Sequence, residues 1–171
     1  MATDFKSIGR NDQGALIAGA VALVLSFFSA YVTVSINGKG LPGVSGSSGI
    51  SAWNSFGTLG MLLVIIATAV VAVKVFAGDQ LPAGVPWNLV AAAAAGLGTL
   101  LLILRAFTYD GGGSFGGVSV DVGPGWSGWA LFVATIALTV FAALSFRDSG
   151  EKIPEFNKNG DATPPPAPPA A

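Results

Sequence analysis

Four long stretches of this chain carry almost no ionisable side chains, and they limit its fold more than any other feature. They lie at about residues 15–36, 56–75, 87–106 and 126–146. A helix that crosses roughly 30 Å of hydrocarbon at 1.5 Å per residue needs about 20 mostly apolar residues, and each stretch has that length. Because a lone strand in lipid leaves its backbone groups unpaired, each stretch is expected to be helical.

The composition indicates that lipid, more than water, solvates this chain. Of its 171 residues, 52% are hydrophobic and only 10% are charged, whereas a typical soluble domain has about 25% charged residues. A soluble protein would lack the polar residues to cover four apolar runs. The sequence therefore predicts an all-α membrane protein, with a four-transmembrane-helix bundle over residues 1–147.

A cleaved signal peptide is an alternative interpretation of the first apolar run. Two acidic residues, Asp4 and Asp12, accompany Lys6 and Arg10 before that run. The run is also longer than the apolar core of a signal peptide, which has about 7–15 residues. Both features favour a retained helix.

The basic residues near the ends of the runs indicate the orientation, because such residues are retained on the cytoplasmic side. If the four runs alternate in direction, Lys39 and Arg105 fall on one side. The other six fall opposite: Lys6, Arg10, Lys74, Arg147, Lys152 and Lys158. This distribution predicts a multi-pass plasma-membrane protein with both termini in the cytoplasm. The connections 37–55 and 107–125 then lie outside.

Tryptophan residues agree with this placement. Trp53, Trp126 and Trp129 fall at outer ends of the runs, and Trp87 falls at an inner end. Amphipathic rings favour the interface between lipid and water, so these residues are expected to act as anchors.

The two outer connections are rich in Gly and Ser, yet each contains an alternation typical of a strand. Residues 31–36 alternate and lead into Asn37-Gly38, which is a strong turn signal. In the second connection, Val118, Val120 and Val122 alternate with other residues. These patterns predict either a small antiparallel β element over the outer ends of the helices or disordered glycine loops.

The composition changes after Arg147. Residues 148–163 are polar and charged, and residues 164–171 are proline and alanine only. Such a segment cannot bury a core, so residues 148–171 are predicted to form a disordered, Pro-rich cytoplasmic tail. Polyproline segments can dock on aromatic grooves, but an inert tail is the favoured interpretation.

A stripe of small residues marks one face of the first run. Its members recur at four-residue spacing: Gly14, Ala18, Ala22, Ser26 and Ala30. Lipid offers helices no hydrophobic incentive to meet, so close backbone approach at small residues drives their association. We expect this helix-packing face to contact other helices of the same chain, or alternatively a second protein or a second copy.

The residues that enzymes use most are missing. The chain has no Cys and no His, which removes disulfides, thiol chemistry and metal sites built on these ligands. No acidic residue lies well inside an apolar run, and the glycine runs lack the Lys-Ser/Thr ending of a phosphate loop. The net charge of −1 gives no basic footprint for nucleic acid. No catalytic, cofactor or metal site is predicted, and the chain is expected not to be an enzyme.

Arg105 is the most informative ionisable residue, because it falls at the outer end of the third run. Asp110 follows five residues later, and Asp121 lies in the same outer connection. An ion pair between Arg105 and one of these acids, Asp110 first, would pin the second outer loop. Alternatively, the Arg105 stem covers apolar surface while its guanidinium reaches the lipid head groups.

Short motifs resemble those of a broad group of small, uncharacterised four-helix membrane proteins of high-GC Gram-positive (actinobacterial) type. The first run ends in Phe27-Phe28-Ser29-Ala30-Tyr31-Val32, the second is entered through Ala52-Trp53-Asn54-Ser55-Phe56-Gly57, and Arg105 is late in the third. The likeness covers about residues 14–147. It implies an envelope or cell-surface component and carries no activity.

These features together predict a non-enzymatic accessory or scaffold component of a cell-envelope assembly. The expected partners are the lipid bilayer and either another membrane protein or further copies of the chain. The alternative is a small transporter or channel subunit that acts as an oligomer.

Overall fold

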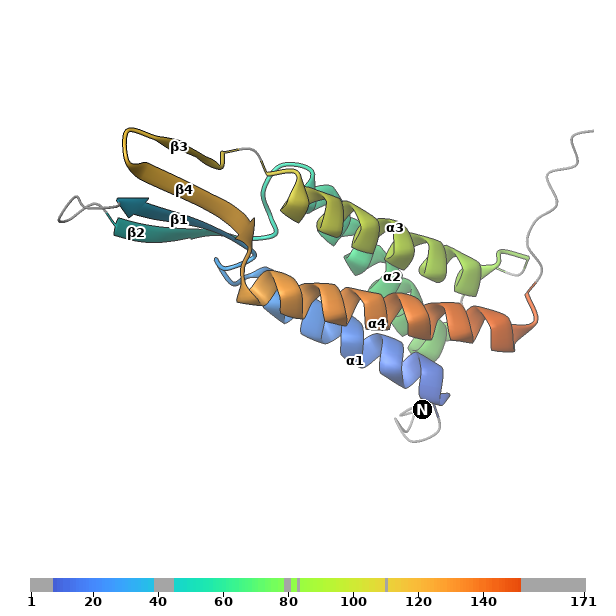
Figure 1. Ribbon diagram of the computed structural model, residues 1–171. Coiled ribbons are helices and arrows are strands. Elements are labelled where there is room, and N and C mark those ends of the chain that lie inside the picture. The colour runs from blue at the N-terminus through green and yellow to red at the C-terminus, as the bar shows by residue number, and fades with distance from the viewer. Residues whose placement is uncertain (1–7, 39–44, 79–80, 83, 110, 152–171) are drawn as a thin grey trace, which may run out of the picture.

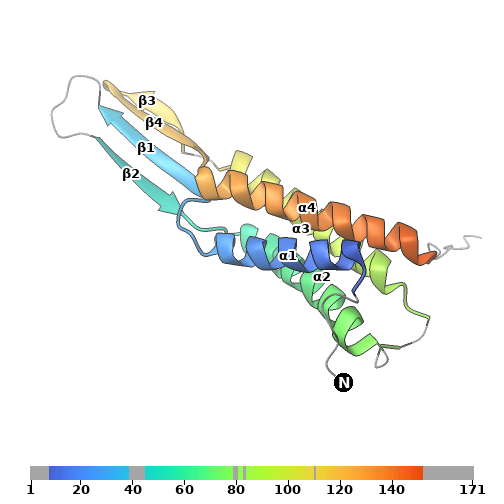
Figure 2. The same ribbon diagram turned by 90° about the horizontal axis from the view of Figure 1, so that it is seen from below.

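The computed structural model describes residues 8–38, 45–78, 81–82, 84–109 and 111–151. In this part of the chain, four helices lie side by side and a sheet projects beyond one end of them (Figures 1 and 2). The strands run in roughly the same direction as the helices. The elements are α1 (Arg10–Ser26), β1 (Val32–Gly38), β2 (Ser45–Ile50), α2 (Gly57–Ala77), α3 (Trp87–Phe107), β3 (Gly113–Phe115), β4 (Val118–Pro124) and α4 (Trp126–Ser149).

This architecture corrects the expectation of an all-α bundle with four spans. The described residues include a four-stranded antiparallel sheet, and three helices among them, α2, α3 and α4, are long and apolar enough to cross a membrane. Helix α1 has 17 residues and ends at Ser26, ten residues before the predicted end at Ile36. The β-branched segment that follows it forms β1 and pairs with a strand on each side, so it cannot continue the helix.

Each helix packs mainly against two others. Helix α1 contacts α4 and α2, and α3 contacts α2 and α4. Glycine sets the closest approach of α2 to α3, because a Cβ on Gly98 would lie 2.8 Å from the Gly60 carbonyl oxygen. A Cβ on Gly19 of α1 would overlap the side chain of Thr68 on α2. Close backbone contact of this kind is how helices associate in lipid.

The helices bury one side and expose large apolar side chains on the other. The largest fully buried side chains of the helices include Met61, Leu102, Leu131 and Leu138. The outward-facing positions hold equally apolar residues, among them Leu59, Ile66, Leu97, Val133 and Ile136. An apolar exterior on helices of this length suits a hydrocarbon solvent.

The predicted helix-packing face of the first run is divided by the end of α1. Ala18, Ala22 and Ser26 are buried in the protein. Gly14 is half-buried, and a Cβ there would lie 2.8 Å from the Phe141 ring of α4. Ala30 follows α1 and lies in the link to β1.

The sheet joins the two outer connections, which lie far apart in the chain. Its strand order is β2-β1-β4-β3. Strand β1 pairs with β2 from Val32↔Ile50 to Asn37↔Ser45 and with β4 from Val32↔Pro124 to Gly38↔Val118. Of the two alternatives that the alternating pattern left open, the described residues adopt the ordered one.

The hairpin between β3 and β4 turns through Gly116 and Gly117. Both have positive φ, 61° and 85°. Two-residue hairpin turns of this type need positive φ at both central positions, and glycine adopts it without steric cost. The Gly-Gly pair therefore allows β3 and β4 to meet directly.

A compact junction joins the sheet to the helices. The Tyr31 N–H donates to the Ile50 carbonyl at 3.0 Å, and the Gly125 N–H donates to the Tyr31 carbonyl at 3.0 Å. Three glycines come so close to the link 29–31 that a Cβ on any of them would overlap a carbonyl oxygen of that link: Gly49, Gly125 and Gly128. The junction therefore holds the ends of β2 and β4 and the start of α4 against one short segment.

We predict that Gly49→Ala lowers the free energy of unfolding by about 1–3 kcal/mol, because the new methyl group forces the Ser29 carbonyl to shift. The matched control is Gly46→Ala in the same strand, where a Cβ meets nothing within 4 Å. Reversible unfolding in mixed micelles and limited proteolysis of the sheet measure both variants. Equal stability of the two variants would contradict the tight junction.

Candidate functional site

The sheet has two chemically different faces. In antiparallel pairs, directly opposed residues share a face, and successive residues of a strand alternate between faces. The observed register therefore places a set of aliphatic side chains on one side, here called the apolar face. Its members are Val32, Val34, Ile36, Val118, Val120 and Val122.

The opposite side, here called the polar face, carries hydroxyl, amide and carboxylate groups. The register aligns Ser35 with both Ser47 and Asp121, and Asn37 with both Ser45 and Ser119. Asp121 is exposed. The two faces of β1 and β4 therefore differ in chemistry, although β2 adds the polar Ser48 to the apolar face opposite Val34.

The apolar face is covered only near the helices. Val32 is buried and Val122 packs against the core, whereas Ile36, further along β1, is 39% exposed. A hollow of about 440 Å³ lies beside β3 and is lined by Gly111, Gly112, Gly113, Ser114, Val118 and Val120. Val34, Val118 and Val120 are half-buried, so the exposed apolar surface of this face centres on Ile36.

Tyr31 anchors the sheet in the helices. Its side chain is 2% exposed, and its hydroxyl donates a hydrogen bond to the Leu102 carbonyl of α3. Its ring meets Phe132 of α4 edge-on at 6.2 Å between centroids. Burial raises the pKa of the Tyr31 phenol above its usual range, and the nearby Arg105 charge opposes this only in part. The hydroxyl therefore stays protonated as a donor at physiological pH.

Arg105 lies in the last turn of α3, at the same end as the sheet. Its Nη2 donates to Asn54 Oδ1 at 3.1 Å, and its Cζ lies 4.2 Å from the centroid of the Tyr109 ring and 5.3 Å from that of Phe56. The candidate partner Asp110 lies outside the described residues, so the predicted loop-pinning pair remains a prediction. The observed contacts join Arg105 to the β2–α2 link instead.

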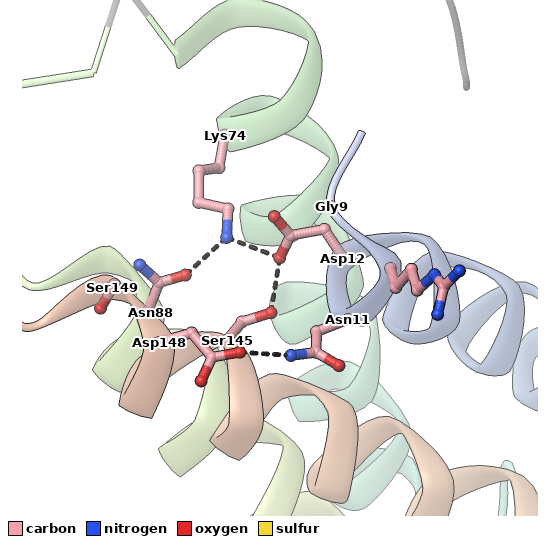
Figure 3. Close-up of a pocket in the computed structure, with 9 residues that line it drawn as sticks. Gly9, Asn11, Asp12, Lys74, Asn88, Ser145, Asp148 and Ser149 are labelled. Atoms are coloured by element: carbon pink, nitrogen blue, oxygen red, sulfur yellow. Dashed lines mark hydrogen bonds and ion pairs between the residues drawn. The ribbon is translucent and has the colours of Figure 1, made fainter. Parts of the chain in front are cut away.

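A second polar site lies at the other end of the helices. There Lys74 Nζ is 2.6 Å from Asp12 Oδ1 and 2.6 Å from Asn88 Oδ1 (Figure 3). The same Asp12 oxygen accepts a hydrogen bond from the Ser145 hydroxyl at 2.7 Å. Asn11 donates to Asp148 at 2.7 Å. One connected cluster therefore joins α1, α2, α3 and α4.

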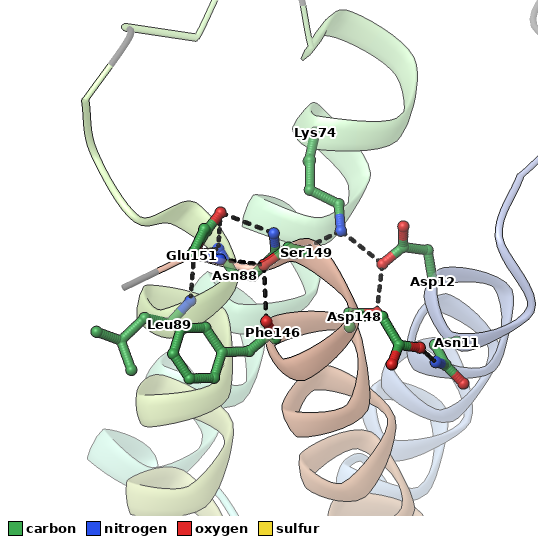
Figure 4. A network of polar contacts seen from close by, with 10 residues as sticks. Asn11, Asp12, Lys74, Asn88, Leu89, Phe146, Asp148, Ser149 and Glu151 are labelled. Atoms are coloured by element: carbon green, nitrogen blue, oxygen red, sulfur yellow. Dashed lines mark hydrogen bonds and ion pairs between the residues drawn. The ribbon is translucent and has the colours of Figure 1, made fainter. Parts of the chain in front are cut away.

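Glu151 extends this network beyond α4 (Figure 4). Its carboxylate accepts hydrogen bonds from the backbone N–H of Asn88 at 3.1 Å and of Leu89 at 3.3 Å, and from the Asn88 side chain at 2.8 Å. The two backbone N–H groups belong to the first turn of α3, where they have no partner inside the helix and favour a negative charge. The chain folds back for this contact at Gly150, whose φ is 67°.

A pocket of about 500 Å³ opens among these polar residues. Its walls come from the starts of α1 and α3 and the ends of α2 and α4. Its charged lining residues are Arg10, Asp12, Lys74 and Asp148. Lys74 and Asp12 are only 23% and 20% exposed. In the described part of the chain, no group of three or more acidic, His or Cys residues is arranged to hold a metal ion.

The sequence marked Lys74 and Asp12 only as inner-side charges and did not single out Asn88, Ser145 or Glu151. A signal for them exists, because each lies within a few residues of the inner end of a predicted run. Polar groups at neighbouring helix ends must satisfy one another or water. The predicted disordered tail starts too early at residue 148, because Asp148 and Ser149 belong to α4 and Glu151 is hydrogen-bonded to α3. Residues 152–171 lie outside the described residues.

Comparison with protein-family models, with curated proteins and with solved structures found no match to this chain.

We predict that Lys74→Met destabilises the protein by about 1–3 kcal/mol, because the part-buried Asp12 and Asn88 lose a common donor. The control is Arg147→Met, which removes a cation that is 78% exposed and 3.7 Å from Asp148. An exposed pair contributes about 0–1 kcal/mol. Unfolding in mixed micelles compares the two, and a larger loss in the Arg147 variant would rule out a stabilising role for the cluster.

Proposed function

We propose that this chain is a non-enzymatic integral membrane protein that acts as an accessory or scaffold component of a cell-envelope assembly. In this proposal the helices hold the sheet outside the lipid, and a partner protein docks on the apolar face. The observation that carries the proposal is the row of aliphatic side chains on the sheet beyond the helices, of which Ile36 is exposed and Val34, Val118 and Val120 are half-buried. Large exposed apolar surfaces outside lipid are typical of interaction sites.

The orientation in this proposal is that of a plasma-membrane protein with the sheet outside the cell. Both ends of the described chain lie at the end of the helices opposite the sheet, since Asn11 contacts Asp148. Arg10, Lys74 and Arg147 also lie at that end, and Arg105 lies at the sheet end. The positive-inside rule then favours a cytoplasmic location for the basic end and for both termini.

The junction supports a scaffold role. A surface presented to a partner costs less entropy on binding when it is already ordered. Here, β1 and β4 are already paired over seven residues each. Strand β1 follows α1 after the short link 27–31, and β4 leads into α4 through Gly125. The sheet therefore offers a preorganised surface.

The test is photocrosslinking in native membranes with a benzoylphenylalanine placed at Ile36 or at Asn37. These neighbours are both exposed and point to opposite faces of the sheet. We expect Ile36 to give a discrete adduct at several times the yield from Asn37, with the same partner protein in repeated mass-spectrometric identifications. Equal yields at both positions would argue against docking on the apolar face.

A second measurement addresses the alternative role. We expect liposomes that contain only this protein to show no more solute flux than empty liposomes. Selective flux through the protein alone would replace the scaffold role with that of a transporter or channel subunit.

A further inference from the structure

Within the described part of the chain, the guanidinium of Arg105 is held in place by neutral groups and has no acidic partner. Ion pairs among the described residues join Lys74 to Asp12 and Arg147 to Asp148, and none involves Arg105. Its partners are a neutral amide, that of Asn54, and the rings of Tyr109 and Phe56. A guanidinium has five N–H donors in a planar fork and stays charged at all physiological pH values. Its hydrogen bond to Asn54 uses one of these donors, and no other contact with a described residue uses the rest.

The contacts of Arg105 come from three separate segments of the chain. The side chain itself extends from α3, Asn54 and Phe56 belong to the link before α2, and Tyr109 follows α3. The two rings restrict the guanidinium, and Asn54 orients it through a single hydrogen bond. A cation fixed in this way loses little further rotamer entropy when it binds a ligand.

The location of Arg105 determines which anions it meets. Helix α2 begins and α3 ends here, and both are candidate spans, so in the proposed membrane orientation the guanidinium lies at the level of lipid head groups. Exposed aromatic residues surround the same end, including Phe107, Trp126 and Trp129. The first turn of α2 beside Arg105 contains no acidic residue that would offset the positive charge.

We propose that Arg105, positioned by Asn54, Phe56 and Tyr109, binds a phosphate group at the outer membrane surface. The guanidinium fork matches two phosphate oxygens and forms charge-assisted hydrogen bonds with them. The phosphate is that of a phospholipid head group or of a soluble phosphate ester, which present the same chemistry to the fork. This site rests on the proposed membrane location and orientation, but not on the docking role of the sheet.

The test uses the full-length protein in an uncharged detergent and native mass spectrometry of lipid adducts. The probes are phosphatidylglycerol and a diacylglycerol with the same acyl chains and no phosphate. We expect the wild-type protein to bind phosphatidylglycerol preferentially, and Arg105→Gln to raise its dissociation constant roughly tenfold, as expected for the loss of hydrogen bonds to a charged group. Arg147→Gln, at the opposite end, is the matched control and should leave the constant unchanged.

Two further arms complete the experiment. Arg105→Lys retains the charge without the planar fork, so its affinity for the lipid should lie between those of the wild type and Arg105→Gln. It also provides a conservative variant in case Arg105→Gln fails to fold. Displacement of the lipid by millimolar sn-glycerol 3-phosphate would identify a soluble phosphate ester as a ligand, and no displacement would identify the lipid. Equal binding of phosphatidylglycerol by the wild type and both Arg105 variants, or equal binding of the two lipids by the wild type, would overturn the proposal.

Discussion

Two backbone hydrogen bonds at Tyr31 fix the position of the sheet relative to the helices. Its N–H pairs with Ile50 at the end of β2, and its carbonyl accepts from Gly125 just before α4. The buried Tyr31 side chain reaches Leu102 of α3 at the same time. One residue therefore joins both outer connections to the helices, and the glycines at 49, 125 and 128 make room for this crossing because they lack a Cβ.

The two ends of the helices are stabilised by different interactions. At the sheet end, aromatic rings and close backbone contacts dominate. At the other end, Lys74 connects Asp12 with Asn88, and the Glu151 carboxylate occupies the start of α3. Between these ends, apolar side chains face outward, where lipid would provide no hydrophobic driving force for association. Small residues in the middle and polar contacts at the rim then hold the helices together.

Hydropathy located three of the helices closely. The predicted runs 56–75, 87–106 and 126–146 correspond to α2, α3 and α4, which differ from them by three residues or fewer at either end. It failed for the first run, where 15–36 was predicted and α1 covers Arg10–Ser26. A buried strand such as the start of β1 is as apolar as a span, so hydropathy alone cannot separate them. The missing information was the pairing of β1 with β4, which lies far away in the chain.

The candidate sites, like the helices, could be predicted from the sequence only in part. The stripe of small residues was visible from spacing, and the charge of Arg105 near an outer boundary was visible from position. The neighbours of Arg105 were not, because Asn54 and Phe56 reach it only when α2 and α3 pack together. Likewise, Asn88 and Ser145 join Lys74 and Asp12 only through the side-by-side arrangement of four helices.

By itself, the sequence determined the local properties of this protein: long apolar helices suited to lipid, alternating segments able to form strands, and glycines able to turn. These properties follow from the composition and spacing of residues that lie near one another in the sequence. Only the tertiary structure decided which strands pair, which face of the sheet is apolar and which charges meet. Those outcomes depend on contacts between distant segments, whose free energy is set by register and packing and not by any local pattern.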